Sequence, residues 1–297
     1  MSHRVASLRT GERAALLAAE EACALVTALA VAPHDPTGVH EARKSLRRLR
    51  SLLALVRDAL GKEAVDAIDD ELRAMTRDLS ALRDGQVVQD LARLLAREAA
   101  DPGERENWQA LLPALARRHE QVLAAALCED PGFMRRQAQA HRQAEQLRQL
   151  PWQRLKAGDL RHALARSQRR QARAQATAMA SGQVDDLHGW RRKSRRLRMQ
   201  LSALRKLQVA PRGKAARLPP RFISQLVDQL GTLQDLVLLH RALEALEPAH
   251  ARAKRIVPRS RVRTASPIQP LAQLRLPPRR RHGNPRQERP PGADTDA

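Results

Sequence analysis

Hydrophobic positions along the chain follow the period of amphipathic helices from about residue 10 to about residue 250. Periodic segments of roughly 15 to 25 residues, long enough for helices, alternate with short breaks rich in Gly and Pro. These breaks lie at residues 32–38, 101–104, 129–132, 181–183 and 209–213. Helices of this length joined by short loops pack as antiparallel neighbours. The pattern therefore predicts an all-α fold.

Residues 39–50 hold the clearest separation of polar and apolar positions. On a helix that turns about 100° per residue, His40 and the cations after it lie within about 80° of one direction. These cations are Arg43, Lys44, Arg47, Arg48 and Arg50. The opposite side, which a bundle would bury, holds Leu46, Leu49, Leu52, Leu53 and Val56. The segment predicts a helix with a buried apolar back and a basic face.

The same pattern occurs a second time, about 150 residues later, which is a repeat on the scale of a whole helical bundle. Counted from His188, basic residues again stand at offsets three, four, seven, eight and ten, namely Arg191, Arg192, Arg195, Arg196 and Arg198. The block "LSALRD" (79–84) follows the first copy, and "LGTLQD" (230–235) follows the second. The order predicts a tandem duplication with one helical bundle per repeat, at about 10–150 and 151–250.

The charge of the chain makes the basic faces more informative. Lys and Arg total 54 against 32 Asp and Glu, a net charge of +22, so the partner is expected to be a polyanion: nucleic acid, a membrane surface or a polyphosphate. Residues 187–227 contain twelve Lys or Arg and no acid. Like charges four residues apart destabilise a helix, so a bound anion explains the faces better than a solvated surface does. The excess of Arg over Lys favours phosphate.

The two basic helices and their "LxxLRD" and "LxxLQD" partners resemble the CHAD domain, the conserved histidine α-helical domain, over residues 10–250. The resemblance implies two four-helix bundles related by pseudo-twofold symmetry around a basic surface. It also implies binding of inorganic polyphosphate and recruitment to polyphosphate granules. The residues implied in binding are His40, Arg43, Lys44, Arg47, Arg48 and Arg50 in one half, and His188, Arg191, Arg192, Arg195, Arg196 and Arg198 in the other.

The function expected from the sequence is therefore non-enzymatic binding of polyphosphate, with nonspecific binding to duplex nucleic acid as the alternative. Aromatic residues make up 2% of the chain, which leaves few platforms for stacking single-stranded bases. The recurring Asp84 and Asp235 are expected to cap helices or to pair with arginines, because no nucleophile, phosphate loop or catalytic set accompanies them. No metal-binding spacing such as HxxxH occurs, and we expect no metal and no cofactor.

The remaining features concern location and packing. Cys23 and Cys128 have no CxxC spacing, which excludes a disulfide framework and favours a reducing, cytoplasmic environment. Residues 14–32 are apolar but include Glu20 and Glu21, so we expect a bundle helix and no membrane association. The three tryptophans are expected to be packing residues. Residues 251–297, with eight prolines, twelve Lys or Arg and three acids, predict a disordered basic tail.

Overall fold

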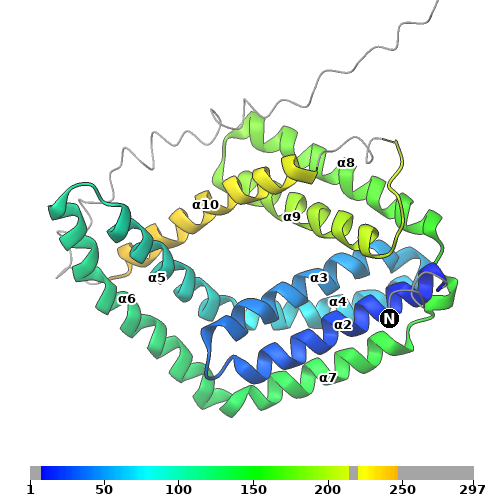
Figure 1. Cartoon of the computed structure of the whole chain (residues 1–297), viewed down its shortest axis with the longest axis horizontal. Helices are drawn as coiled ribbons and strands as arrows, with labels where there is room; N and C mark the ends of the chain where they lie inside the picture. The colour runs from blue at the N-terminus through cyan, green and yellow to red at the C-terminus, as the bar shows by residue number, and fades with distance from the viewer. Residues whose placement is uncertain (1–7, 214–219, 247–297) are drawn as a thin grey trace, which may run out of the picture.

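The computed structural model describes residues 8–213 and 220–246, and all regular elements in these ranges are helices (Figure 1). The α-helices are α2 (Thr10–Val31), α3 (Pro36–Leu60), α4 (Lys62–Asp78), α5 (Ser80–Glu98), α6 (Pro102–Glu129), α7 (Met134–Gln149), α8 (Ala157–Ser181), α9 (Val184–Lys206) and α10 (Pro220–Glu244). Two 3₁₀ turns, η1 (Pro131–Phe133) and η2 (Trp152–Arg154), flank α7. The all-α prediction is confirmed. The tail predicted at 251–297 lies outside the described residues.

The start of the first basic helix, α3, is fixed by local chemistry. Asp35 precedes the helix and its carboxylate accepts a hydrogen bond of 2.8 Å from the Thr37 amide. Pro36 occupies the first helical turn, where its missing N–H has no partner to lose. Gly38 lies so close to the end of α2 that a Cβ there would stand 2.5 Å from the Ala32 nitrogen. The turn between α2 and α3 therefore requires glycine.

Four helices, α2, α3, α4 and α7, form the first bundle. The apolar side predicted for α3 lies in its core, where Leu46, Leu49, Leu52, Leu53 and Val56 are all buried. Among the described residues, α2 alone has the length and apolar composition of a membrane span. It packs against α3 and α7, with residues such as Leu25 and Leu29 buried, and is thus a core helix of this bundle.

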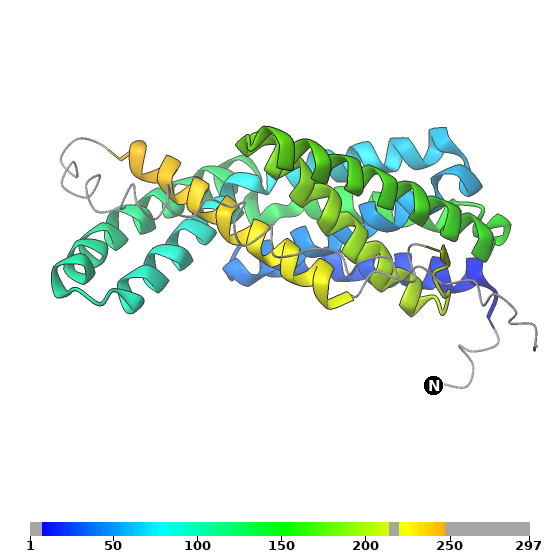
Figure 2. The ribbon, with the colours of Figure 1, turned by 90° about the horizontal axis from the view of Figure 1, so that it is seen from above.

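The second half of the chain is organised around α10. Figure 2 shows α10 running diagonally from the hairpin of α8 and α9 to the hairpin of α5 and α6. Trp190 of α9 packs with Leu226 and Leu230 at one end, and Trp108 of α6 packs with Leu239 and Leu243 at the other. Trp152 is buried as well, so the prediction that the tryptophans serve packing is confirmed.

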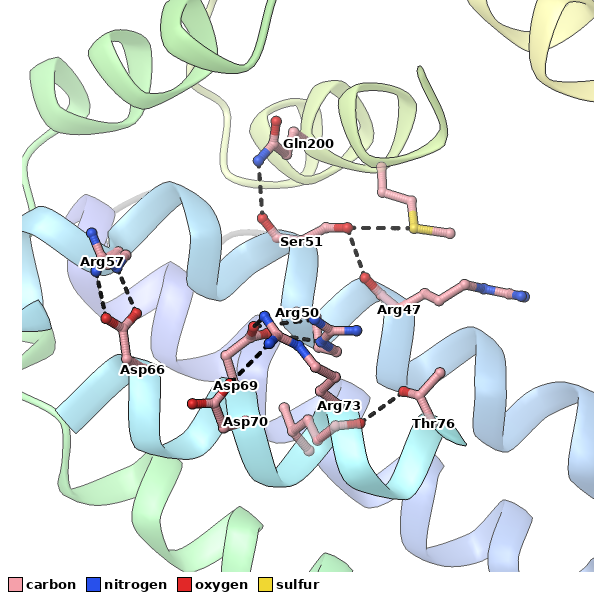
Figure 3. Close-up of polar contacts among 12 residues, drawn as sticks. Arg47, Arg50, Ser51, Arg57, Asp66, Asp69, Asp70, Arg73, Thr76 and Gln200 are labelled. Carbon is pink, nitrogen blue, oxygen red and sulfur yellow. Dashed lines mark hydrogen bonds and ion pairs between the residues drawn. The ribbon is translucent and has the colours of Figure 1, made fainter. Parts of the chain in front are cut away.

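Corresponding parts of the two repeats lie against each other. The basic helices α3 and α9 are in contact, and so are α5 and α10, which hold the "LSALRD" and "LGTLQD" blocks. At the crossing of α3 and α9, the Ser51 hydroxyl lies 3.6 Å from the Met199 sulfur. Ser51 stands eleven positions after His40, and Met199 stands eleven positions after His188. The Gln200 amide also donates to the Ser51 carbonyl at 3.3 Å (Figure 3). Contacts between equivalent positions are compatible with the predicted tandem duplication.

Candidate anion-binding cleft

One cleft of about 1140 Å³ lies between α3, α9, α5 and α10. We call it the central cleft. All twelve residues predicted for the binding site line it, six from each repeat: His40, Arg43, Lys44, Arg47, Arg48, Arg50, His188, Arg191, Arg192, Arg195, Arg196 and Arg198. The two basic faces are therefore the two walls of a single site. The apolar backs of both helices hold them in place, since Leu46, Leu49 and Leu197 are buried behind the cleft.

The centre of the cleft holds two equivalent arginines, Arg47 and Arg195, each seven positions after its histidine. Burial, together with the positive charges of Arg43 and Arg191, lowers the pKa of Arg47 to about 10. The pKa of Arg195 falls to about 9 for the same reasons, with Arg47 itself among the repelling charges. Both guanidinium groups remain charged at neutral pH. The low pKa values reflect chiefly the burial of the two guanidinium groups and, after that, repulsion by the neighbouring arginines.

Hydrogen-bond donors at this centre lack acceptors within the described part of the chain. The buried Nε atoms of Arg43, Arg47 and Arg191 have no hydrogen-bond partner there. A buried donor without an acceptor costs about 1–3 kcal/mol. Phosphate oxygens would satisfy such donors and neutralise the charge at the same time. We refer to Arg43, Arg47, Arg191 and Arg195 as the central arginines.

Arg43 also has a structural role that its sequence position does not indicate. Its Nη1 donates to the Thr76 carbonyl at 2.8 Å and to the Ser80 hydroxyl at 2.9 Å. Thr76 lies in the last turn of α4, where carbonyls have no partner within the helix. In the second repeat Gly231 takes the place of Ser80, and a Cβ on Gly231 would stand 3.5 Å from Nη2 of Arg191.

Four other predicted cations have acidic partners, and we call them the rim cations. Lys44 pairs with Glu41 at 3.0 Å and Arg48 with Glu21 at 3.3 Å. Arg50 donates two hydrogen bonds to Asp69, at 2.8 and 3.1 Å (Figure 3), and Arg198 pairs with Asp228 at 3.2 Å. The inference that a ligand must supply the missing negative charge is therefore wrong for these four. Three of the acids come from other helices, α2, α4 and α10, so the local sequence does not reveal them.

The two histidines stand at equivalent places, each the fifth residue of its helix. Nδ1 of His188 lies 2.6 Å from the Gln234 side-chain oxygen, so this nitrogen carries a proton and donates it. Burial lowers the pKa of His188, and the neighbouring Arg192 and Arg191 lower it further against the effect of Gln234. Burial and Arg83 lower the pKa of His40. Both rings are thus held toward their neutral form while the cleft is without an anion.

Asp84 and Asp235 line the same cleft. Neither caps a helix, because Leu79 is the N-cap of α5 and Asp235 lies well inside α10. Burial raises the pKa of each carboxyl, opposed chiefly by Arg43 for Asp84 and by Arg191 for Asp235. The structure shows neither of the two roles expected from the sequence: no cap and, among the described residues, no ion pair to either carboxylate. Arg43 and Arg191 act on the two carboxyls through their charge alone.

Three comparisons place this architecture among known proteins. The family model described as "CHAD domain" matches residues 13–244. The crystal structure of the CHAD domain from the plant Ricinus communis is similar, with a TM-score of 0.64 and 22% identity over 91% of this chain and 94% of that one. PptA from Streptomyces chartreusis has a TM-score of 0.59 and 17% identity, over 90% of this chain and 100% of that one. No curated protein sequence matches. The chain belongs to the CHAD domain family.

Sequence reasoning left out several residues that line the cleft of this CHAD domain. They include three cations, Arg83, Arg205 and Lys206. Arg83 precedes Asp84 in the first "LxxLRD" block, which is the one signal that could have placed it in the site. Arg205 and Lys206 lie in the last turn of α9, where basic residues also favour the helix dipole. Their position in the cleft follows from the packing of α9 and could not be read from spacing.

The two cysteines of this CHAD domain are exposed and unpaired, as their spacing indicated. No group of three or more His, Cys, Asp or Glu side chains with the placement of a metal site occurs within residues 8–213 and 220–246. Guanidinium, ammonium and imidazole groups outnumber the four acids, Glu21, Asp84, Asp228 and Asp235, in the lining of the cleft. The common chemistry of the basic groups is donation to anionic oxygens.

Proposed function

We propose that this CHAD domain binds inorganic polyphosphate in the central cleft, without catalysing a reaction, and that this binding recruits it to polyphosphate granules. The observation that supports the proposal most strongly is the convergence of twelve predicted residues on one cleft, where the buried Nε atoms of Arg43, Arg47 and Arg191 have no hydrogen-bond partner in the described part of the chain. A flexible polymer of phosphates offers closely spaced anionic oxygens to these donors. Membership of the CHAD family supports the same ligand.

Nucleic acid fits the cleft less well. The donors are recessed between four helices, whereas the phosphates of a duplex lie on the outside of a wide, stiff rod. No Trp or Phe is among the described residues that line the cleft, so bases would find no aromatic surface for stacking. A thin polyanion without bases meets neither obstacle.

The proposal is tested by direct binding of long-chain polyphosphate, duplex DNA and RNA, compared at equal phosphate concentration and physiological salt. We expect polyphosphate to bind at least tenfold more tightly than either nucleic acid. The titrations are made with the full chain and with a chain ending at residue 250, because basic tails bind any polyanion. Equal affinity of the shorter chain for random duplex DNA would contradict the proposal.

Recruitment and the absence of catalysis need separate measurements. A fluorescent fusion is expected to collect on polyphosphate granules in cells that make the polymer, and to stay dispersed in cells unable to make it. Incubation of the purified protein with polyphosphate is expected to release no phosphate and to leave the chain length unchanged. Release of phosphate that disappears on substitution of Asp84 or Asp235 would overturn the non-enzymatic proposal.

A further inference from the structure

A second cavity, of about 480 Å³, lies between α3, α4, α8 and α9. Charged residues dominate its lining, among them Arg50, Arg57, Asp69, Arg166, Arg170 and Arg196. Arg50 and Arg196 also line the central cleft, so the two cavities meet at these side chains. The sequence motifs do not include Arg57, Arg166 or Arg170, and α8 contributes nothing to the twelve predicted residues.

Each of the three acids that line the second cavity forms an ion pair with an arginine. Asp66 pairs with Arg57, and Asp58 pairs with Arg166 at 2.5 Å. Asp69 accepts both hydrogen bonds from Arg50, as Figure 3 shows for the Arg50 and Arg57 pairs. Two cations in this lining, Arg170 and Arg196, have no acid within ion-pair distance in the described part of the chain. A net positive charge is therefore left to meet an anion.

The basic face of α3 continues from one cavity into the other. Arg43, Arg47, Arg50 and Arg57 are spaced at four, three and seven residues, which keeps them on one side of the helix. They span fourteen residues, about 21 Å along the axis, whereas Arg43 to Arg50 spans about half that length. On the facing helix, partial burial lowers the pKa of Arg196, Asp69 opposes this effect, and the charges of Arg50 and Arg170 lower the pKa further. Cations thus follow one another from the central cleft to α8.

The geometry of the Arg50 pair suits a junction between the cavities. Arg50 uses Nε and Nη2 to hold Asp69, and its Nη1 takes no part in that pair. The side chain is fixed, because it is only 16% exposed and held by two hydrogen bonds. A phosphate at the junction could accept from Nη1 of Arg50 and from Arg196 without breaking the ion pair.

We infer that the second cavity is an exit subsite for a phosphate polymer. A chain that fills the central cleft leaves it between Arg50 and Arg196 and places its next phosphates against Arg170 and Arg166 of α8. The inference rests on the proposed function and adds a length requirement to it. A short chain is held by the central cleft alone, and a longer chain gains contacts on α8 that increase its residence time.

Charge reversal of Arg170, compared with the same change at its neighbour Arg169, tests the inference. Both side chains are exposed on α8, but Arg170 lines the second cavity and Arg169 lines neither cavity. Arg170→Glu and Arg169→Glu alter the net charge equally, which removes the effect of the overall field. Binding of a size-fractionated polyphosphate series is measured for both full-length variants and for the wild type, with circular dichroism to verify that helicity is unchanged.

We expect Arg170→Glu to match the wild type for short chains and to bind about tenfold more weakly above a threshold length, because one charge-assisted contact is replaced by repulsion. Arg169→Glu should stay within about twofold of the wild type at every length. Equal length dependence for both variants would overturn the exit subsite while leaving the central cleft intact. Weakening by Arg170→Glu at all lengths alike would also overturn it. Failure of the wild type to bind at any length would instead contradict the proposed function.

Discussion

The centre and the rim of the cleft use the same residue types for different purposes. The central arginines, Arg43, Arg47, Arg191 and Arg195, lie close together, have partly buried side chains and form no ion pair within the described residues. The rim cations, Lys44, Arg48, Arg50 and Arg198, each pair with an acid. Both sets come from the same two motifs, at interleaved offsets.

This difference separates folding from binding. A rim pair stabilises the fold or orients a side chain, and a ligand must compete with the acid for every donor that the pair uses. At the centre the charged groups are partly buried and repel one another, a cost that anionic oxygens of a ligand would offset. Substitution of the central arginines should therefore weaken ligand binding more than substitution of the rim cations does. Substitution of Arg50 at the rim should lower the stability of the fold.

The largest expected effect is on polyphosphate affinity. The double variant Arg47→Gln/Arg195→Gln should weaken binding at least a hundredfold, because two charge-assisted contacts of about 1.5–3 kcal/mol each are lost. The matched variant Arg48→Gln/Arg198→Gln also removes one arginine from each helix, but we expect a loss of only about fivefold. Isothermal titration at physiological salt measures both. Equal losses would mean that net charge alone governs binding and that the centre is not distinct.

A smaller effect is expected on the stability of the free protein at the rim. Arg50→Gln should lower the free energy of unfolding by about 2 kcal/mol, since it leaves the half-buried carboxylate of Asp69 without its two hydrogen bonds. Urea denaturation measures the loss, and Arg73→Gln, which alters a more exposed partner of Asp69, is the control. An unchanged midpoint for Arg50→Gln would show that the pair contributes nothing to the fold.

Substitution of two central arginines should change the stability of the free protein in the opposite direction. Arg47→Gln/Arg195→Gln should raise the free energy of unfolding by about 1 kcal/mol, because it removes repulsion that the free protein sustains at a functional site. The same denaturation series, run without polyphosphate, measures the gain. A loss of stability would indicate that packing of the two side-chain stems outweighs the repulsion of their charges.

The smallest effect concerns pH. His40 and His188 have lowered pKa values in the free protein, and nearby phosphates would raise them, so binding takes up protons. Affinity should therefore increase about threefold as the pH falls from 8 to 6, through the usual range of histidine. The double variant His40→Gln/His188→Gln should lose most of this dependence. A pH dependence that survives intact in that variant would show that the two histidines are not its source.

The helical fold and the two basic faces could be predicted because both depend on spacing within one helix. The position of Leu49 opposite Arg47, for example, follows from the helical period alone. Two helix boundaries were not predicted. Gly61, with a φ of 106°, separates α3 from α4, and Leu79 separates α4 from α5 without any Gly or Pro. The break at Leu79 is a single residue, across which helical hydrogen bonds continue, from the Leu79 amide to the Met75 carbonyl and from the Arg83 amide to the Leu79 carbonyl.

The partners of the rim cations and the second cavity were beyond sequence reasoning for another reason. Glu21, Asp69 and Asp228 reach the basic helices from α2, α4 and α10, and Arg170 reaches the second cavity from α8. These meetings depend on how helices are placed in space, which periodicity does not specify. The second copy of the motif supplied what no single helix could, namely the expectation of a second, equivalent basic face.

Arginine footprinting tests most directly whether polyphosphate occupies the centre of the cleft. The intact protein is treated with an arginine-modifying reagent with and without saturating long-chain polyphosphate, and the modification rate of each arginine is measured by mass spectrometry. We predict the greatest protection at Arg47, Arg191 and Arg195, and none at Arg117 and Arg118 on α6, which lie outside the cleft. Protection confined to residues outside the cleft, with unchanged rates at the three central positions, would contradict the account.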